Sequence, residues 1–251
     1  MKPVIKIFHT DIEMAEKLAD ELQVAMDQAK LKHHNFYLAV SGGITPITFY
    51  KQLAQTPYQS KIAWRYLHLF WGDERCVPAD NPQSNYGLTR YNLLEHLDIP
   101  ERNIHRLCGE VDPVAEACRY AEEIKNTLPI TNRGWPWFDW ILLGLGNDGH
   151  TASLFPGSPA LKEKHDLCAV SIQPDSGQKR ITFTLPLINH ARRITFLVTG
   201  ESKAGLVADI INQTKTGQLL PAAKVRSERG IVEWYLDSMA ATIWTTRHLK
   251  E

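Results

Sequence analysis

The sequence predicts an α/β protein with a three-layer α/β/α arrangement, in which a mainly parallel sheet carries helices on both faces. The first observation is a series of short, continuous apolar runs, which are typical of strands buried on both faces. The second is that amphipathic segments with apolar residues at helical spacing separate most of these runs. Because parallel neighbours need crossover connections, this alternation favours a parallel sheet.

The elements can be placed one by one. The expected strands are rich in apolar and β-branched residues and cover 4–8, 36–40, 67–71, 138–143, 168–172, 180–185, 194–199 and a last one that begins at 231. The expected helices begin near a capping residue or a proline and cover 11–30, 45–54, 84–94, 112–127, 202–212 and a last one that ends near 246. We expect a polar loop over 72–81. No segment resembles an interdomain linker, so residues 1–251 are predicted to form one domain.

The charge and cysteine content exclude several classes of protein. Lys and Arg together number 28, as do Asp and Glu, so the chain lacks the broad basic field that attracts nucleic acids and anionic membranes. No apolar run is long enough to span a membrane, and the N-terminus is not typical of a signal peptide. The four cysteines form no CxxC pair and no metal-ligand spacing is evident, which favours a cytoplasmic protein with reduced thiols and no metal site. A monomer and a small homo-oligomer are equally compatible with the sequence.

Three unusual loops follow predicted strands, at the carboxyl edge where α/β sheets bind ligands. The first contains Ser41, Gly42, Gly43 and Thr45, and it leads into a helix. Paired glycines allow close approach of a ligand, and free N–H groups at the helix start favour a phosphate. The alternative is a plain glycine turn in which Thr45 caps the helix. A P-loop pattern is absent.

The second and third loops carry charged side chains. Asp73 and Arg75 follow a buried strand, a pattern typical of a functional site, of a solvated surface loop or of a local ion pair. The third loop runs from Gly144 to His150 and formally matches G-x-G-x-x-G, but two prolines soon after it leave room for only a short helical turn and not comfortably for a full Rossmann crossover helix. Asp148 and His150 instead suggest a general base oriented by a carboxylate, against the alternative of a capping histidine and a turn aspartate.

Two further cations lie at strand ends. Arg180 begins a predicted strand and Lys203 begins a predicted helix. Each is either an ordinary surface charge or a group that holds an anion.

Taken together, these segments resemble the 6-phosphogluconolactonase family, within the wider glucosamine-6-phosphate isomerase/deaminase superfamily. The matching stretches occur in the family's order and cover most of the chain: SGGITP (41–46), FWGDERCVP (70–78), SNYGLTRYNLL (84–94), LLGLGNDGHTASLFPG (142–157), RITFTLPLIN (180–189), FLVTGESKA (196–204) and LPAAKV (220–225). The resemblance implies a three-layer α/β/α fold and hydrolysis of 6-phospho-D-glucono-1,5-lactone in the oxidative pentose phosphate pathway. It also implies that no metal or organic cofactor is used.

The resemblance carries residue roles to matching positions. His150 matches the proposed base that activates water, and Asp148 is expected to orient or polarise it. Asp73 and Arg75 match the DER loop at the substrate. The phosphate-binding positions match Ser41, Gly42, Gly43, Thr45, Arg180 and Lys203.

Two rival functions remain open. A glucosamine-6-phosphate deaminase/isomerase resembles DGHIAFNEP at this motif, with a glutamate where this chain has Phe155. Phenylalanine cannot supply the additional acid/base group that ring opening and proton transfer need, which favours the lactonase. A non-catalytic sugar-phosphate sensor on the same fold would have no need of the Asp148 and His150 pair.

Overall fold

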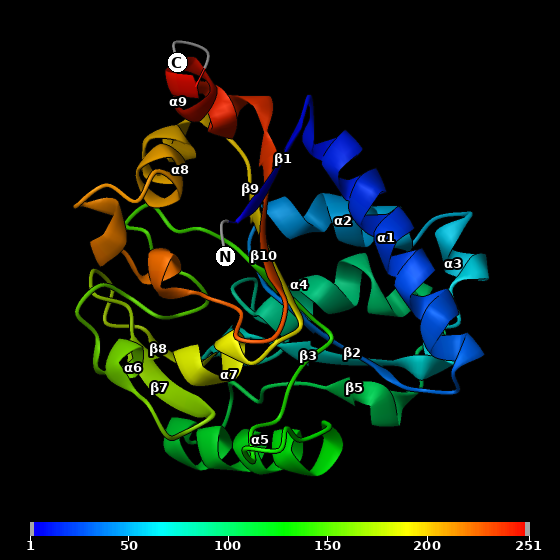
Figure 1. Ribbon diagram of the computed structural model, residues 1–251. Helices are drawn as coiled ribbons and strands as arrows, with labels where there is room; N and C mark the ends of the chain where they lie inside the picture. The colour runs from blue at the N-terminus through cyan, green and yellow to red at the C-terminus, as the bar shows by residue number, and fades with distance from the viewer. Residues whose placement is uncertain (1–2, 249–251) are drawn as a thin grey trace.

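A seven-stranded parallel sheet forms the centre of the computed structural model, which describes residues 3–248 (Figure 1). Every neighbouring pair in it is parallel. In spatial order its strands are β1 (Val4–Phe8), β10 (Ile231–Asp237), β9 (Arg193–Val198), β6 (Trp140–Leu143), β2 (Phe36–Val40), β3 (Leu67–Trp71) and β5 (Ile104–His105). The predicted α/β class with a mainly parallel sheet is confirmed.

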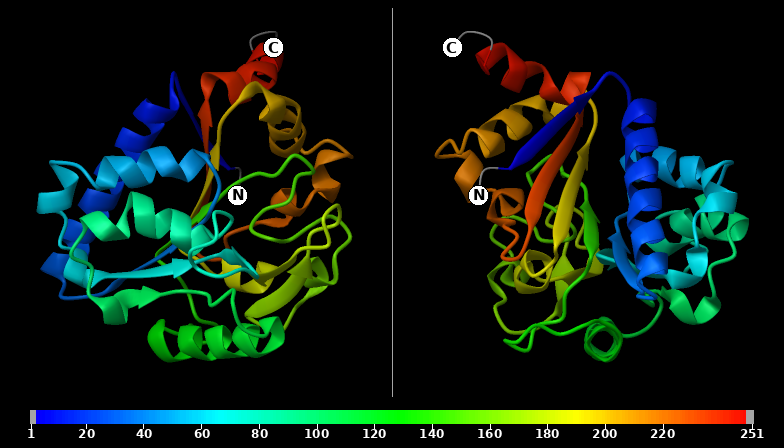
Figure 2. Two further views of the ribbon diagram at one scale, coloured as in Figure 1. Left: turned by 180° about the vertical axis from the view of Figure 1, so that it is seen from behind. Right: turned by 45° about the vertical axis from the view of Figure 1, so that its right-hand side comes forward.

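Helices cover both faces of this sheet. Figure 2 shows α1 on one side of the sheet and α8 on the other. The helices are α1 (Asp11–Leu31), α2 (Thr45–Leu53), α3 (Tyr58–Lys61), α4 (Asn85–Asn92), α5 (Pro113–Thr127), α6 (Pro159–Lys162), α7 (Leu185–Asn189), α8 (Ala204–Ile211) and α9 (Ser238–His248). Across the part of the chain that the structure describes, no helix combines the length and apolar character needed to cross a membrane.

Side-chain caps begin three of the predicted helices. Thr10 accepts a hydrogen bond from the N–H of Glu13, and Ser84 accepts one from the N–H of Gly87. Asp112 accepts from two N–H groups at the start of α5. Each cap satisfies N–H groups that the first helical turn leaves without a partner, so these starts were visible in the sequence.

A second, smaller sheet corrects the prediction of a polar loop over 72–81. Asp73–Arg75 forms β4, which pairs antiparallel with β8 (Lys179–Phe183), and β8 pairs antiparallel with β7 (Cys168–Ile172). The sequence of β4 is charged throughout and shows no alternation, so nothing local marks it as a strand. Its pairing with β8 depends on tertiary contacts instead.

Several predicted boundaries were also wrong by a few residues. The strand predicted over 180–185 ends at Phe183, because Leu185 begins α7 with Pro186 in its first turn. The strand predicted from 138 begins at Trp140, and the helix predicted from 202 begins as α8 at Ala204 after a short 3-10 turn. The short strand β5 and the short helices α3, α6 and α7 were not predicted.

The connections of the sheet diverge between β2 and β6. The chain leaves β2 through α2 and α3 toward β3, whereas it leaves β6 toward β9 on the opposite side. Such a reversal opens a crevice beyond the carboxyl ends of the two strands, where open α/β sheets bind ligands. The buried side chains of both sheets belong to one hydrophobic core beneath this crevice.

Candidate active site

A cavity of about 480 Å³ occupies the crevice beyond β2 and β6. All three loops singled out in the sequence contribute to it. Its lining is Ser41, Gly42, Gly43, Ile44, Thr45, Pro46, Asp73, Arg75, Asn85, Gly144, Leu145, Gly146, His150, Ala152, Arg180, Leu197, Val198, Thr199 and Lys203. Of the predicted site residues, only Asp148 is outside this lining, and it contacts the cavity through His150.

The loop after β2 brings backbone close to the cavity. Gly42 packs against the carboxamide of Asn85, and a Cβ at position 42 would lie 1.7 Å from the Asn85 Oδ1 atom. Gly43 has a φ of +97°, which side chains rarely adopt. Thr45 begins α2 but does not cap it: its hydroxyl is 2.9 Å from that of Thr199 on the loop after β9. The plain-cap interpretation of Thr45 is therefore wrong.

Asp73 is buried in β4 with its carboxylate held in place. Ser153 Oγ donates to one carboxylate oxygen at 2.6 Å, and Asn85 Nδ2 donates to the other at 3.3 Å. Asn85 Nδ2 also donates to the Asp73 main-chain oxygen at 2.9 Å. These bonds tie β4, α4 and the loop after His150 together at one side of the cavity.

Glu74 is 1% exposed and points away from the cavity, into the start of α4. Its carboxylate accepts from the N–H groups of Arg75, Asn85 and Tyr86 and from the Ser84 hydroxyl. Burial raises the pKa of Glu74, and these donors oppose the rise. Glu74 was not among the predicted site residues, and its four hydrogen bonds fix β4 to α4.

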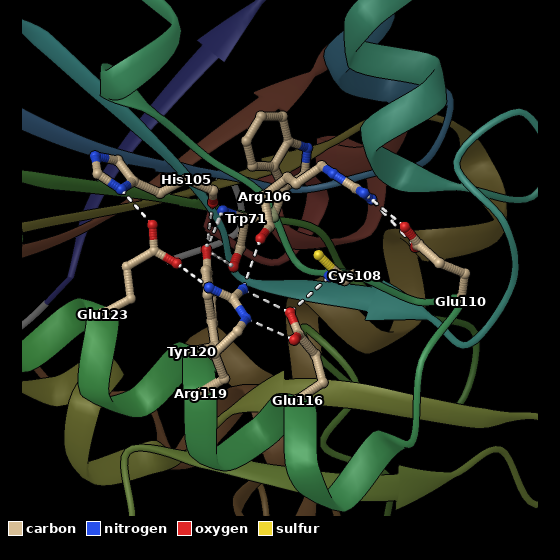
Figure 3. A network of polar contacts seen from close by, with 9 residues as sticks. All are labelled: Trp71, His105, Arg106, Cys108, Glu110, Glu116, Arg119, Tyr120 and Glu123. Carbon is tan, nitrogen blue, oxygen red and sulfur yellow. Dashed lines mark hydrogen bonds and ion pairs between the residues drawn. The ribbon is translucent and has the colours of Figure 1, made fainter.

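The strand that leads into β4 is braced from α5. Figure 3 shows the Tyr120 hydroxyl between the main chains of Trp71 and His105. Tyr120 accepts a hydrogen bond from the N–H of Trp71 at 2.9 Å, and the His105 carbonyl oxygen lies 3.0 Å from the hydroxyl. Because Trp71 ends β3 two residues before Asp73, this contact fixes where the second loop begins.

The loop after β6 presents His150 to the cavity. The imidazole Nδ1 is 2.5 Å from Asp148 Oδ1, and the same oxygen accepts the His150 main-chain N–H at 3.1 Å. A Cβ at Gly146 would lie 2.1 Å from the imidazole, so only glycine leaves room for this ring position. Asp148 faces one ring nitrogen, and the other, Nε2, has no hydrogen-bond partner among the side chains that the structure describes.

Three cations line the cavity. Arg75 and Arg180 are directly opposite each other on β4 and β8, and Lys203 lies on the loop after β9. Arg75 donates to the Gln83 main-chain oxygen at 2.6 Å, and Lys203 donates to the Asn147 side chain. Burial lowers the pKa of Arg180 and of Lys203, opposed by the charges of Asp73 and Asp148 respectively. Within the described residues no carboxylate forms an ion pair with any of the three, and such a cluster suits an anionic ligand.

Sequence reasoning missed Asn85, Ser153 and Thr199. Asn85 lies in the motif SNYGLTRYNLL directly after the predicted cap Ser84, and its amide side chain at a helix start was the signal available. The contacts of Ser153 with Asp73 and of Thr199 with Thr45 join segments far apart in the chain. They left no local signal.

The chain is similar to a known family of proteins over most of its length. The model of the family described as glucosamine-6-phosphate isomerases/6-phosphogluconolactonase matches residues 9–234. The chain belongs to this family. A 6-phosphogluconolactonase of Haemophilus influenzae is 42% identical over 94% of this chain and 97% of its own length. A 6-phosphogluconolactonase of Synechocystis is 41% identical over 81% of this chain and 82% of its own length.

Solved structures of the family share the fold. The 6-phosphogluconolactonase of Trypanosoma brucei matches with a TM-score of 0.84 at 29% identity, covering 96% of this chain and 98% of its own. A monomeric glucosamine-6-phosphate deaminase matches with a TM-score of 0.79 at 20% identity, covering 97% of this chain and 100% of its own. The second match shows only that both activities of the family use this fold.

Proposed function

We propose that this protein is a 6-phosphogluconolactonase, which hydrolyses 6-phospho-D-glucono-1,5-lactone to 6-phospho-D-gluconate. Membership of the family and the identity to named lactonases support the reaction. The observation that carries the proposal is the His150 imidazole, held by Asp148 in a cavity lined by three cations. Such a cavity suits a small anionic substrate that a general base must act on.

In the proposed mechanism His150 is the general base. Its Nε2 accepts a proton from a water molecule as the water oxygen attacks the lactone carbonyl carbon. The tetrahedral intermediate collapses by breaking the bond between that carbon and the ring oxygen, and the imidazolium returns the proton to the ring oxygen. Asp148 holds the ring in the required tautomer and stabilises the imidazolium.

The remaining site residues bind the substrate in this proposal. Main-chain N–H groups of the loop containing Ser41, Gly42, Gly43 and Thr45, at the start of α2, suit a phosphate group. Arg75, Arg180 and Lys203 add positive charge around the cavity. Asp73 is fixed by Ser153 and Asn85, so it is placed to orient a substrate hydroxyl or one of the arginines.

Phe155 argues against the deaminase alternative. It is wholly buried beside His150 and has no acid or base to offer for ring opening. A sensor without catalysis would have no need of the short bond between Asp148 and His150.

The experiment that tests the function is a lactonase assay beside a deaminase assay, without added metal. We expect lactone hydrolysis above the spontaneous rate, followed by NMR or by coupling to a dehydrogenase, and no ammonia release from glucosamine 6-phosphate. A hydrolysis rate equal to the background would refute the lactonase. An unphosphorylated lactone serves as the control, and equal activity on it would refute the phosphate site.

We also propose that residues 1–251 form one domain that works in the cytoplasm as a monomer or small homo-oligomer. The undivided hydrophobic core beneath both sheets supports one domain. Light scattering of the purified protein distinguishes the oligomeric states.

A further inference from the structure

Phe155 is a large apolar side chain in an unusual place. Its exposure is 0%, although it lies only five positions after His150, which lines the cavity. The residue follows the tight turn that begins at Thr151, where the main chain bends directly after His150. Its ring is therefore buried beside His150, a residue that lines the cavity.

Two polar groups of the site pack on this ring. The centroids of the Phe155 and His150 rings are 4.7 Å apart, with a tilt of 55°. The Arg180 guanidinium carbon lies 5.6 Å from the Phe155 centroid, within the range of a cation–π contact. One side chain thus touches both the proposed base and a proposed anion-binding cation, which come from different elements.

The ring completes the support of His150. Asp148 holds Nδ1, Gly146 leaves room for the imidazole at close range, and Phe155 packs against it. Side chains that are restrained from several directions keep a catalytic geometry that a single hydrogen bond does not maintain.

Because the Phe155 ring is uncharged, it gives the Arg180 guanidinium no ion-pair partner inside the protein. Arg180 Nε is buried without a hydrogen-bond partner, and no carboxylate among residues 3–248 pairs with this side chain. Among the acids, Asp73 has the largest electrostatic effect on Arg180, and its carboxylate accepts hydrogen bonds from Ser153 and Asn85 instead of forming an ion pair with Arg180. A polar or acidic residue at position 155 would offer Arg180 a partner inside the protein.

We infer that Phe155 is a positioning residue of the site: its ring holds the His150 imidazole and the Arg180 guanidinium, and its lack of charge leaves Arg180 available to the substrate. The inference rests on the proposed lactonase function for its kinetic consequences. Its structural content does not depend on that function, because it concerns the contacts of three side chains.

The charges around these groups define the expected pH behaviour. His150 contacts Asp148, while Arg180 feels the charges of Asp73, Glu74 and Arg75 on β4 and of Cys76 just after it. Lys203 is close enough to Asp148 to feel its charge. A carboxylate at position 155 adds a negative charge next to both His150 and Arg180, so it stabilises the protonated imidazole and neutralises the guanidinium.

The test uses three substitutions and one matched control. Phe155→Leu keeps an apolar side chain but removes the ring, and we expect kcat to fall about tenfold with the pH profile unchanged. Phe155→Gln and Phe155→Glu have nearly the same shape and differ in charge. We expect Phe155→Glu to raise KM about tenfold over Phe155→Gln and to move the acid limb of the kcat profile to higher pH. The control is Phe138→Leu, because Phe138 is wholly buried in the core and packs on Phe70 and Phe183.

Thermal melting of Phe155→Leu and Phe138→Leu measures how far each substitution destabilises the fold, and kcat measures its effect on the site. If Phe155→Leu and Phe138→Leu lower kcat equally, Phe155 has only a structural role and the inference is wrong. Identical KM values and pH profiles for the glutamate and glutamine variants also overturn it.

A readout without catalysis distinguishes this inference from the proposed function. The His150 ring proton, assigned by its loss in His150→Ala, is followed by NMR during a pH titration. We expect a higher midpoint in Phe155→Glu than in Phe155→Gln. Equal midpoints refute the inference even if the wild-type protein hydrolyses lactone, whereas a shifted midpoint in a protein without lactonase activity refutes only the function.

Discussion

Two clusters of charged side chains in this protein are built in opposite ways. The α5 network, formed by His105, Arg106, Glu110, Glu116, Arg119 and Glu123, pairs its cations with carboxylates (Figure 3). Arg119 alone contacts Glu116 at 2.6 Å and Glu123 at 2.5 Å. In the cavity, by contrast, the described residues provide no carboxylate partner for Arg75, Arg180 or Lys203.

The difference separates charges used for folding from charges kept for a ligand. A polar network whose members are all paired holds elements together, and removing one member leaves its partner's charge unpaired. Unpaired cations in a cavity cost stability, and they are retained where a ligand supplies the missing anion. The comparison thus predicts which substitutions change activity and which change stability.

The largest effect is expected from His150→Ala. Removing the proposed base should lower kcat by about 10²–10⁴-fold with a smaller change in KM, because general-base catalysis acts in the transition state. Steady-state kinetics measure it, and His165→Ala is a control since His165 is an exposed histidine outside the cavity. A kcat within a few-fold of wild type would exclude His150 from the mechanism.

The contrast between the two clusters is tested by substituting one arginine from each, Arg180 and Arg119, with alanine. Arg180→Ala should lower kcat/KM by about 10²-fold, the loss typical of one charge-stabilising donor, and change stability by less than about 1 kcal/mol. Arg119→Ala should do the reverse and cost about 2 kcal/mol of stability, because Glu116 is 2% exposed and keeps the Cys108 N–H but loses its cationic partner. The kinetics should be retained. Urea unfolding and kinetics on both variants decide it. If both arginines affect the same property, the division between the two clusters is wrong.

The smallest effect concerns pH and His68, which lies 3.0 Å from His105 at the edge of the α5 network. Burial, together with the charges of His105 and Arg102, lowers the pKa of His68 to about 4. The unfolded chain therefore binds a proton that the folded chain does not, and stability is lost as pH falls from about 6.5 toward 4. We expect the melting temperature of wild type relative to His68→Phe to decline over this range. A difference that is constant with pH would contradict the shift.

The sequence predicts most of the sheet and the position of the cavity, and the reasons are physical. The bounds of β2 and β3 were predicted correctly because strands buried on both faces are continuous apolar runs. The three loops were found because they follow such strands. The strand β4 was missed because its charged residues pair through β8, and the contact of Asn85 with Gly42 was missed because it joins α4 to another loop. Phe155 drew attention for the carboxylate it lacks, whereas its packing on His150 and Arg180 needed coordinates.

The meeting of β2 and β6 has a consequence for how the protein acquires activity during folding. The two strands pair through Leu38 with Trp140 and Ala39 with Ile141, partners about a hundred residues apart in the sequence. Contacts across such long stretches form late, because closing a long loop costs chain entropy before the contact repays it. The cavity is assembled only when these two strands are adjacent. Recovery of activity during refolding should therefore lag behind the formation of helices. Its rate would report when β2 and β6 pair in the central sheet.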